Sequence, residues 1–136
     1  MKKFEIINHT ADVGIIAYGK TISELFENAA YGMFSLITNP EKIKEQIIIP
    51  ISGDAHDKEE LLITFLNEIL YYYQTKKMLF KRFEILESSE THLDANISGE
   101  KISEHRILHD IKAATYHNLK IEETADGYKT QIIFDV

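Results

Sequence analysis

Two aspartates at opposite ends of the sequence offer the kind of oxygen ligands that hold a metal ion. Asp12 interrupts an apolar stretch between Ala11 and Val13, and Asp135 is the penultimate residue. Val136, the last residue, would add a main-chain carboxylate beside that of Asp135. If the first and last strands lie near one another, these groups form a cluster of hard ligands, which suits Ca²⁺ or Mg²⁺ better than a soft metal.

A more ordinary interpretation of the same acids is also open, and spacing alone favours it. Asp12 then stands at a turn or strand start and bonds to nearby backbone, as short acidic side chains commonly do. In that case Asp135 is simply an exposed acid at the end of the last strand.

The histidines suggest weaker alternatives. His105 and His109 stand four residues apart, as zinc ligands on one helix face do, but the zincin pattern His-Glu-x-x-His is not met, because residues 106–108 are Arg-Ile-Leu. Exposed or hydrogen-bonded histidines are the ordinary interpretation. His9 and His117 could serve as acids or bases, yet no nucleophile with an orienting partner can be named beside them.

Other residues that could do chemistry give little further signal. Lys112 lies in an apolar run, where a cation either faces a partner carboxylate or simply points outward from a strand. The aromatic run at residues 71–73 could stack on bases, but core and rim packing explains it better. No GxGxxG or Walker-type pattern occurs in the sequence, so it offers no nucleotide cradle.

The composition indicates one compact domain over residues 1–136. With 44% hydrophobic residues, the chain can bury enough apolar surface to fold alone, and the lack of cysteine excludes disulfides and thiolate metal sites. The net charge of -7 disfavours direct nucleic-acid binding and is compatible with a cation or a basic protein partner, as well as with an ordinary cytosolic surface. We find no signal peptide or membrane-length apolar run and expect a cytoplasmic protein.

Two segments have the caps and the periodicity of long amphipathic helices. Thr21 opens a Ser/Thr-x-x-Glu capping box, and apolar residues recur at helical spacing after it until Asn39-Pro40 ends the pattern. Asp57 caps a second helix of about five turns, which ends near residues 76–77.

The other segments predict strands. Residues 4–6 and 13–18 are two short strands joined by residues 8–12, Asn-His-Thr-Ala-Asp. Residues 45–51 contain Pro50 and so predict an edge strand, which a turn at residues 52–54 follows.

From residue 79 onward the apolar residues alternate, which predicts an antiparallel meander with a turn at Asp126-Gly127. Its strands are expected at residues 79–86, 92–98, 119–123 and 128–136. Residues 105–117 fit a helix or a strand equally well. The fold class is therefore α+β, a single domain with one largely antiparallel sheet and two long amphipathic helices packed on one side.

Five phrases, in order along the whole chain, closely resemble the archease family. They are HTADVG at residues 9–14, ELFENAAYGMF at 24–34, LNEILY at 66–71, KA-x-TYH at 112–117 and the Phe-Asp-aliphatic ending at 134–136. Ala114 stands where valine is usual in the family, and the other positions of these phrases match.

The resemblance implies a small cytosolic protein that activates the GTP-dependent RtcB-type RNA ligase in tRNA splicing. Such a protein promotes guanylylation of the ligase and multiple turnover, and is not itself an enzyme. The resemblance also implies that Asp12, Asp135 and Val136 bind a divalent cation, Ca²⁺ first and Mg²⁺ or Mn²⁺ as alternatives. Lys112 is the expected contact to the ligase. Two rival functions are a metal-dependent hydrolase and a general chaperone-like binding protein.

Overall fold

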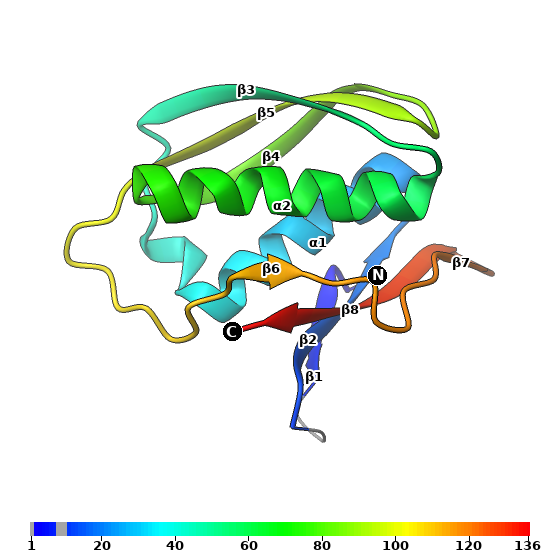
Figure 1. Ribbon diagram of the computed structural model, residues 1–136, viewed down its shortest axis with the longest axis horizontal. Helices are drawn as coiled ribbons and strands as arrows, with labels where there is room; N and C mark the ends of the chain where they lie inside the picture. Colours follow the sequence, from blue (N-terminus) through cyan, green and yellow to red (C-terminus); the bar gives the residue numbers. More distant parts are fainter. Residues whose placement is uncertain (1, 8–10) are drawn as a thin grey trace.

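The computed structural model describes residues 2–7 and 11–136, and in this part of the chain two long helices lie between two antiparallel sheets (Figure 1). The helices are α1 (Ile22–Ile37) and α2 (Lys58–Lys76), with a short 3-10 helix η1 (Pro40–Lys42). The strands are β1 (Phe4–Ile7), β2 (Val13–Gly19), β3 (Ile47–Asp54), β4 (Met78–Ser88), β5 (His92–Lys101), β6 (Ala113–Ala114), β7 (Glu122–Thr124) and β8 (Gly127–Asp135).

The strands form two separate sheets, not the single sheet expected. One has the order β1-β2-β8-β6, with β7 also paired to β8, and the other has the order β3-β5-β4. The α+β class, the antiparallel pairing and the two long helices are confirmed. Both helices lie on one side of each sheet, because they fill the space between the sheets (Figure 1).

The helix boundaries follow from the caps. The N–H of Glu24 donates to Thr21 Oγ1 over 3.0 Å at the start of α1, and the N–H of Glu60 donates to Asp57 Oδ1 over 2.8 Å at the start of α2. The end of α2 is Lys77, whose φ of 55° places it in the left-handed region that ends many helices.

The core fills the layer between the sheets. Phe34 of α1 is fully buried and lies against Phe80 and Phe83 of β4, with ring centroids 5.8 and 5.7 Å away. α1 contacts both sheets, whereas α2 contacts the three-stranded sheet and β6. α2 therefore borders the short strand that lies beside the C-terminal end of β8.

The turn expected at residues 52–54 is wrong, because these residues continue β3. Gly53 is paired with Leu93 in the ladder with β5, and Asp54 is paired with His92. A Cβ at Gly53 would lie 3.3 Å from Thr64 Cγ2 of α2, so the glycine serves close helix packing. The expectation that Pro50 marks an edge strand is confirmed, since β3 pairs only with β5 among the described strands.

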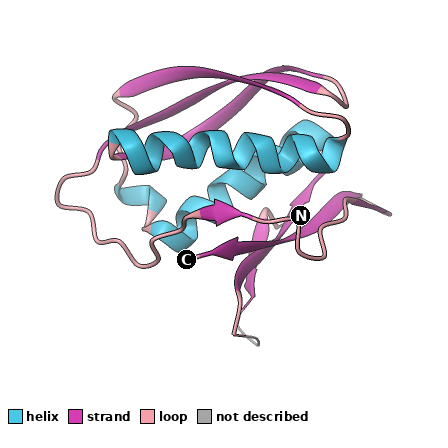
Figure 2. Cartoon of the chain, in the orientation of Figure 1, coloured by secondary structure: helices cyan, strands magenta, loops and turns pink. Residues whose placement is uncertain are grey.

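Residues 105–117 form neither a helix nor a long strand. Residues 102–112 link β5 to the two-residue strand β6 as an irregular segment, coloured as a loop in Figure 2, and residues 115–117 follow β6 outside any strand. The strand expected at 119–123 is shifted and shorter, as β7, and the strand at 128–136 is confirmed as β8. In the expected 8–12 connection, residues 8–10 lie outside the described residues.

Candidate functional site

The two aspartates meet at one end of the five-stranded sheet. β2 and β8 are antiparallel, and their last ladder pair is Val13 with Phe134. Asp12 immediately precedes Val13 and Asp135 immediately follows Phe134, so both acids lie at the same end of the β2–β8 ladder although they stand near opposite ends of the sequence.

Asp135 lies on the face of the sheet that is turned away from α1. Ile132 and Phe134 are buried in the core layer, and alternation along β8 places Asp135 on the opposite face, whereas Asp12 lies just before the start of β2. Both aspartates are exposed. A ligand or a partner protein can therefore reach them without any rearrangement of the core.

Gly14 lets the strands approach closely beneath this pair. A Cβ at this position would lie 2.6 Å from the carbonyl oxygen of Ile132, 2.9 Å from Ile133 Cδ1 and 3.2 Å from Ile7 Cδ1. Ile7 and Ile133 are buried and lie on either side of the glycine. Ile7, Gly14 and Ile133 thus form a small packed apolar cluster next to the acids, and this packing fixes the nearby backbone of β2 and β8.

The segment that contains Lys112 lies along the other side of β8. Ala113 is paired with Asp135, and the N–H of Lys112 donates to the carbonyl oxygen of Asp135 over 2.8 Å. Lys112 is exposed. The four residues of the expected metal site and ligase contact, Asp12, Lys112, Asp135 and Val136, therefore lie at the same end of the sheet.

The donors at this end fit a hard cation by type and charge, but they are few. Within residues 2–7 and 11–136, no three His, Cys, Asp or Glu side chains are grouped so that they could hold a metal ion. Two aspartates, with the main-chain carboxylate of Val136, make a set of oxygen donors of the kind that Ca²⁺, Mg²⁺ and Mn²⁺ prefer. Such a set leaves most coordination positions to water or to another molecule.

The helical zinc arrangement of His105 and His109 is wrong, because both lie in the irregular segment. The side chain of His105 is only 8% exposed, its Nε2 is 3.0 Å from Glu100 Oε2, and the N–H of Ser103 donates to its Nδ1 over 3.2 Å. The N–H of Lys44 donates to Glu100 over 2.7 Å and, with His105, lowers the pKa of that carboxyl. These contacts fasten the segment to β5.

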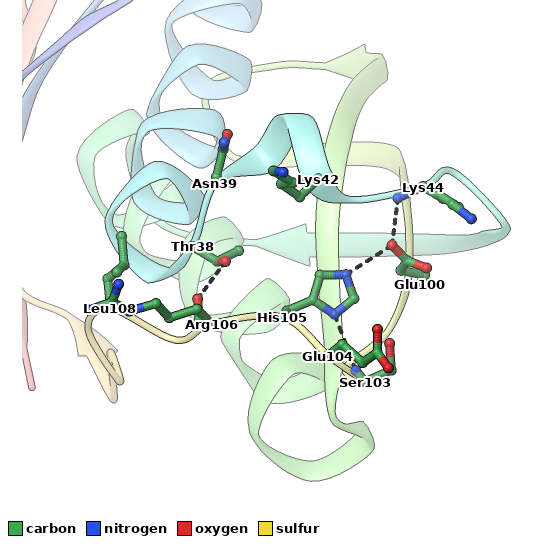
Figure 3. A pocket seen from close by; sticks show the side chains of 10 residues that line it. All are labelled: Thr38, Asn39, Lys42, Lys44, Glu100, Ser103, Glu104, His105, Arg106 and Leu108. Atoms are coloured by element: carbon green, nitrogen blue, oxygen red, sulfur yellow. Dashed lines mark hydrogen bonds and ion pairs between the residues drawn. The ribbon is translucent and has the colours of Figure 1, made fainter.

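His105 and Glu100 line a cavity of about 550 Å³ that lies apart from the aspartates (Figure 3). Its polar groups bond to one another, as Thr38 does by donating to the carbonyl oxygen of Arg106 over 2.7 Å. No buried side-chain polar atom in the described part of the chain lacks a hydrogen-bond partner. The cavity therefore contains no buried polar side-chain atom that needs a ligand to complete its hydrogen bonds.

The remaining candidates have structural environments. His117 is exposed, with its Nε2 3.3 Å from Asn118 Nδ2, and His9 lies outside the described residues. In the aromatic run, Tyr73 is buried and its hydroxyl donates to Asp110 over 2.7 Å, and burial raises the pKa of that hydroxyl. Tyr71 is half exposed and packs edge-on against Tyr72.

Two amide side chains of α2, those of Asn67 and Gln74, contact the segment beside the acids, and no sequence motif had indicated a function for them. Asn67 and Gln74 bond to the backbone of residues 111–114. The only hint in the sequence is that two amides stand seven residues apart, on one flank of a helix that is otherwise apolar on its buried side.

No helix in residues 2–7 and 11–136 is long and apolar enough to cross a membrane.

Comparison with known proteins gives a consistent family. The model of the archease protein family matches residues 4–136. The Protein archease of Methanosarcina mazei is 38% identical over 141 residues, covering 99% of this chain and 97% of the relative. The Protein archease of Saccharolobus islandicus is 40% identical, and all of both chains are covered.

Solved structures resemble the fold as well. The solution structure of a Methanobacterium thermoautotrophicum protein has a TM-score of 0.77 and 32% identity, with all of both chains covered. A Thermotoga maritima crystal structure, described as an archease and possible chaperone, has a TM-score of 0.62 and 24% identity over 96% of this chain and 94% of that chain. The second likeness concerns the fold alone.

Proposed function

The chain belongs to the archease family, and from this premise we propose that it activates a GTP-dependent RtcB-type RNA ligase in tRNA splicing. In this proposal the ligase joins the RNA ends, and the chain promotes guanylylation of the ligase and so permits multiple turnover. The chain itself is a cofactor protein and not a catalyst. The observation that supports the proposal best is the ladder of β2 and β8, whose last pair, Val13 with Phe134, stands next to Asp12 and Asp135 in the sequence.

We further propose that Asp12, Asp135 and the main-chain carboxylate of Val136 hold a divalent cation, Ca²⁺ first and Mg²⁺ or Mn²⁺ as alternatives. The support is the donor type, the exposure of both aspartates and their fixed backbone above Gly14. A divalent cation bound there would offset the negative charge of the carboxylates and polarise a phosphate oxygen brought against it.

The sparse donor set is suited to a site shared with a partner. Calcium takes six to eight oxygen ligands, and magnesium usually keeps several waters. Three carboxylate groups on an exposed sheet end leave positions that a ligase or a nucleotide phosphate can fill. We therefore propose that the aspartates present or position the metal at the ligase, and do not enclose it.

The net charge of the chain supports docking to a basic partner. The chain carries a net charge of -7, whereas a protein that binds RNA generally presents a basic surface. Opposite net charges speed association and orient the encounter. Lys112 is exposed beside the acids, and we propose it as a contact to an acidic group of the ligase.

The test is a ligation assay with RNA halves that carry a 3′-phosphate and a 5′-hydroxyl, in excess over the ligase. With the wild-type chain, we expect repeated turnover and faster formation of the guanylylated ligase. Asp12→Ala and Asp135→Ala should each remove this stimulation, because each deletes one of the proposed ligands. A matched control is Asp126→Ala, which removes an exposed acid just before the far end of β8.

The proposal would be refuted if the Asp12→Ala protein stimulated the ligase fully, to the same extent as the Asp126→Ala protein. Loss of stimulation in the Asp126→Ala protein as well would show that total charge matters and that the sheet end does not.

A metal-dependent hydrolase is the rival enzyme function, using Asp12 and Asp135 with His9 or His117. His117 forms no catalytic arrangement within residues 2–7 and 11–136, where its N–H donates to Thr115 and its ring lies beside Asn118. Incubation of the chain with phosphoester substrates and Mn²⁺, without any ligase, separates the two functions. Metal-dependent hydrolysis that Asp12→Ala abolishes would favour the hydrolase.

A general chaperone-like role is the rival binding function, and the Thermotoga maritima protein is described as a possible chaperone. Such a role should keep unrelated aggregation-prone clients soluble and should not depend on Asp12. Light-scattering assays with such clients, comparing wild type with Asp12→Ala, measure this directly.

A further inference from the structure

The strand β6 is held on one side by β8 and on the other by side chains of a helix. Asn67 of α2 makes two bonds to Ala114, accepting from its N–H at Oδ1 over 2.8 Å and donating from Nδ2 to its carbonyl oxygen over 3.3 Å. A neighbouring strand would make the same pair of bonds. The side-chain amide thus replaces a strand along this edge of β6.

Two helical turns further along the same flank of α2, Gln74 bonds to the same segment through two donor bonds. Its Nε2 donates to the carbonyl oxygen of Lys112 over 2.6 Å and to that of Ile111 over 3.2 Å. Residues seven apart lie on one face of a helix. The flank of α2 therefore carries two amides at the spacing needed to hold residues 111–114 in an extended course.

One peptide group connects Gln74 to the acid site. The carbonyl of Ile111 and the N–H of Lys112 belong to the same planar peptide unit. Gln74 bonds to the carbonyl, and the N–H donates to the carbonyl oxygen of Asp135 over 2.8 Å. A tilt of this peptide unit would therefore be transmitted directly to the main chain of Asp135.

Other side chains also hold the segment, up to Ile111. Ile111 is fully buried and Asp110 accepts from the Tyr73 hydroxyl over 2.7 Å, so the segment is anchored just before Lys112. Gln74 and Lys112 are both exposed. The bonds of Gln74 thus contribute little to the core and act on the orientation of a surface peptide.

We propose that Gln74, assisted by Asn67, is a positioning residue that sets the geometry of the Asp12–Asp135 metal site through the Ile111–Lys112 peptide. This inference rests on the metal site of the proposed function. It assigns to α2, which contributes no ligand, control over the affinity of that site.

The experiment compares Gln74→Met, which keeps the length of the side chain and removes its donor, with Gln74→Lys, which restores a donor. The control is Gln131→Met, which removes an amide from an exposed position of β8. Three quantities are measured: the Kd for Ca²⁺ and Mn²⁺ by calorimetry, hydrogen exchange of the Lys112 amide, and the metal-free Tm.

Loss of a residue that orients a metal ligand typically costs 10- to 100-fold in affinity, and because Gln74 acts through a peptide we expect about tenfold for Gln74→Met. Exchange of the Lys112 amide should accelerate about fivefold, as for loss of a modest hydrogen bond. Gln74→Lys should recover both values, and Gln131→Met should change neither. The metal-free Tm should stay close to wild type in all three variants.

A wild-type Kd in Gln74→Met, with slow Lys112 exchange, would overturn the positioning role while leaving the metal site standing. A wild-type chain that binds neither cation would instead overturn the metal site, and this inference with it. Weaker binding in Gln74→Met that Gln74→Lys does not recover would also count against it, because the role assigned to Gln74 is donation.

Discussion

Replacing Asp135 by asparagine should stabilise the metal-free protein. Asp12 and Asp135 each lie one residue beyond the last pair of the β2–β8 ladder, and two unit charges about 5 Å apart in water repel by about 0.8 kcal/mol. The substituted amide would keep the shape of the side chain and remove this repulsion. For a chain of 136 residues, the entropy of unfolding near Tm makes 1 kcal/mol equivalent to about 3–4 °C, so the expected rise is about 3 °C at low salt.

The salt dependence identifies the cause of this rise. At 1 M salt the Debye length falls to about 3 Å, so the advantage of Asp135→Asn over wild type should largely disappear. Asp126→Asn is the matched control, since it removes one exposed charge just beyond the other end of β8. It should show no comparable rise at either salt concentration.

The same substitution should have the opposite effect when calcium is present. If the site binds Ca²⁺ with a Kd of about 10⁻⁴ M, 10 mM Ca²⁺ stabilises the wild type by about 2.7 kcal/mol, or about 9 °C in Tm. Asp135→Asn should lose most of that gain. The assay is thermal unfolding followed by circular dichroism, with and without Ca²⁺. A lower metal-free Tm for Asp135→Asn than for Asp126→Asn at low salt would refute the reasoning.

Two further predictions concern the strand packing and the pH dependence. Gly14→Ala should lower the free energy of unfolding by about 1–3 kcal/mol, since a Cβ would lie 2.6 Å from the Ile132 carbonyl oxygen. Urea unfolding measures this loss against Gly53→Ala, whose Cβ would lie 3.3 Å from Thr64 Cγ2 and 4.0 Å from Leu61 Cδ1. Equal losses in the two variants would contradict the packing argument. His92 has its Nδ1 2.7 Å from Asp54 Oδ1 and its Nε2 3.2 Å from an Asp94 oxygen, and these bonds raise its pKa. The stabilisation that protonated His92 gives the fold is therefore complete below the ordinary histidine pKa of about 6.5, and it is lost as pH rises through the higher pKa of the folded state. His92→Gln should thus lower Tm at about pH 5.5 and much less at about pH 9. His109→Gln is the control.

The helices could be predicted from sequence because their signals are local. Thr21 and Asp57 have the side chains that cap helices, and each accepts from the N–H three residues later as expected. The division into two sheets could not be predicted. A period of two tells which face of a strand is buried, but it does not say which other strand lies beside it.

The predictions from local residue types were wrong where the conformation of a segment depends on contacts with residues distant in sequence. Ser52-Gly53-Asp54 has the residues of a turn, yet Gly53 continues a strand because α2 packs against it through Thr64. In residues 105–117, apolar spacing suggested a helix or a strand, whereas bonds from side chains distant in sequence determine the course. Asn67 and Gln74 supply four of those bonds, and nothing in the local sequence of residues 111–114 reveals them.

The placement of the two acids is itself an argument for function. Natural sequences usually pair opposite charges across an antiparallel ladder, because like charges directly opposite destabilise it. Here Asp12 stands one residue beyond the last ladder pair and Asp135 ends β8. Repulsion between the acids therefore acts beyond the end of the ladder, where it disrupts few backbone hydrogen bonds, and next to the tightly packed cluster around Gly14. Under the proposed function, a divalent cation bound at this exposed end of the sheet would offset the negative charges of both acids.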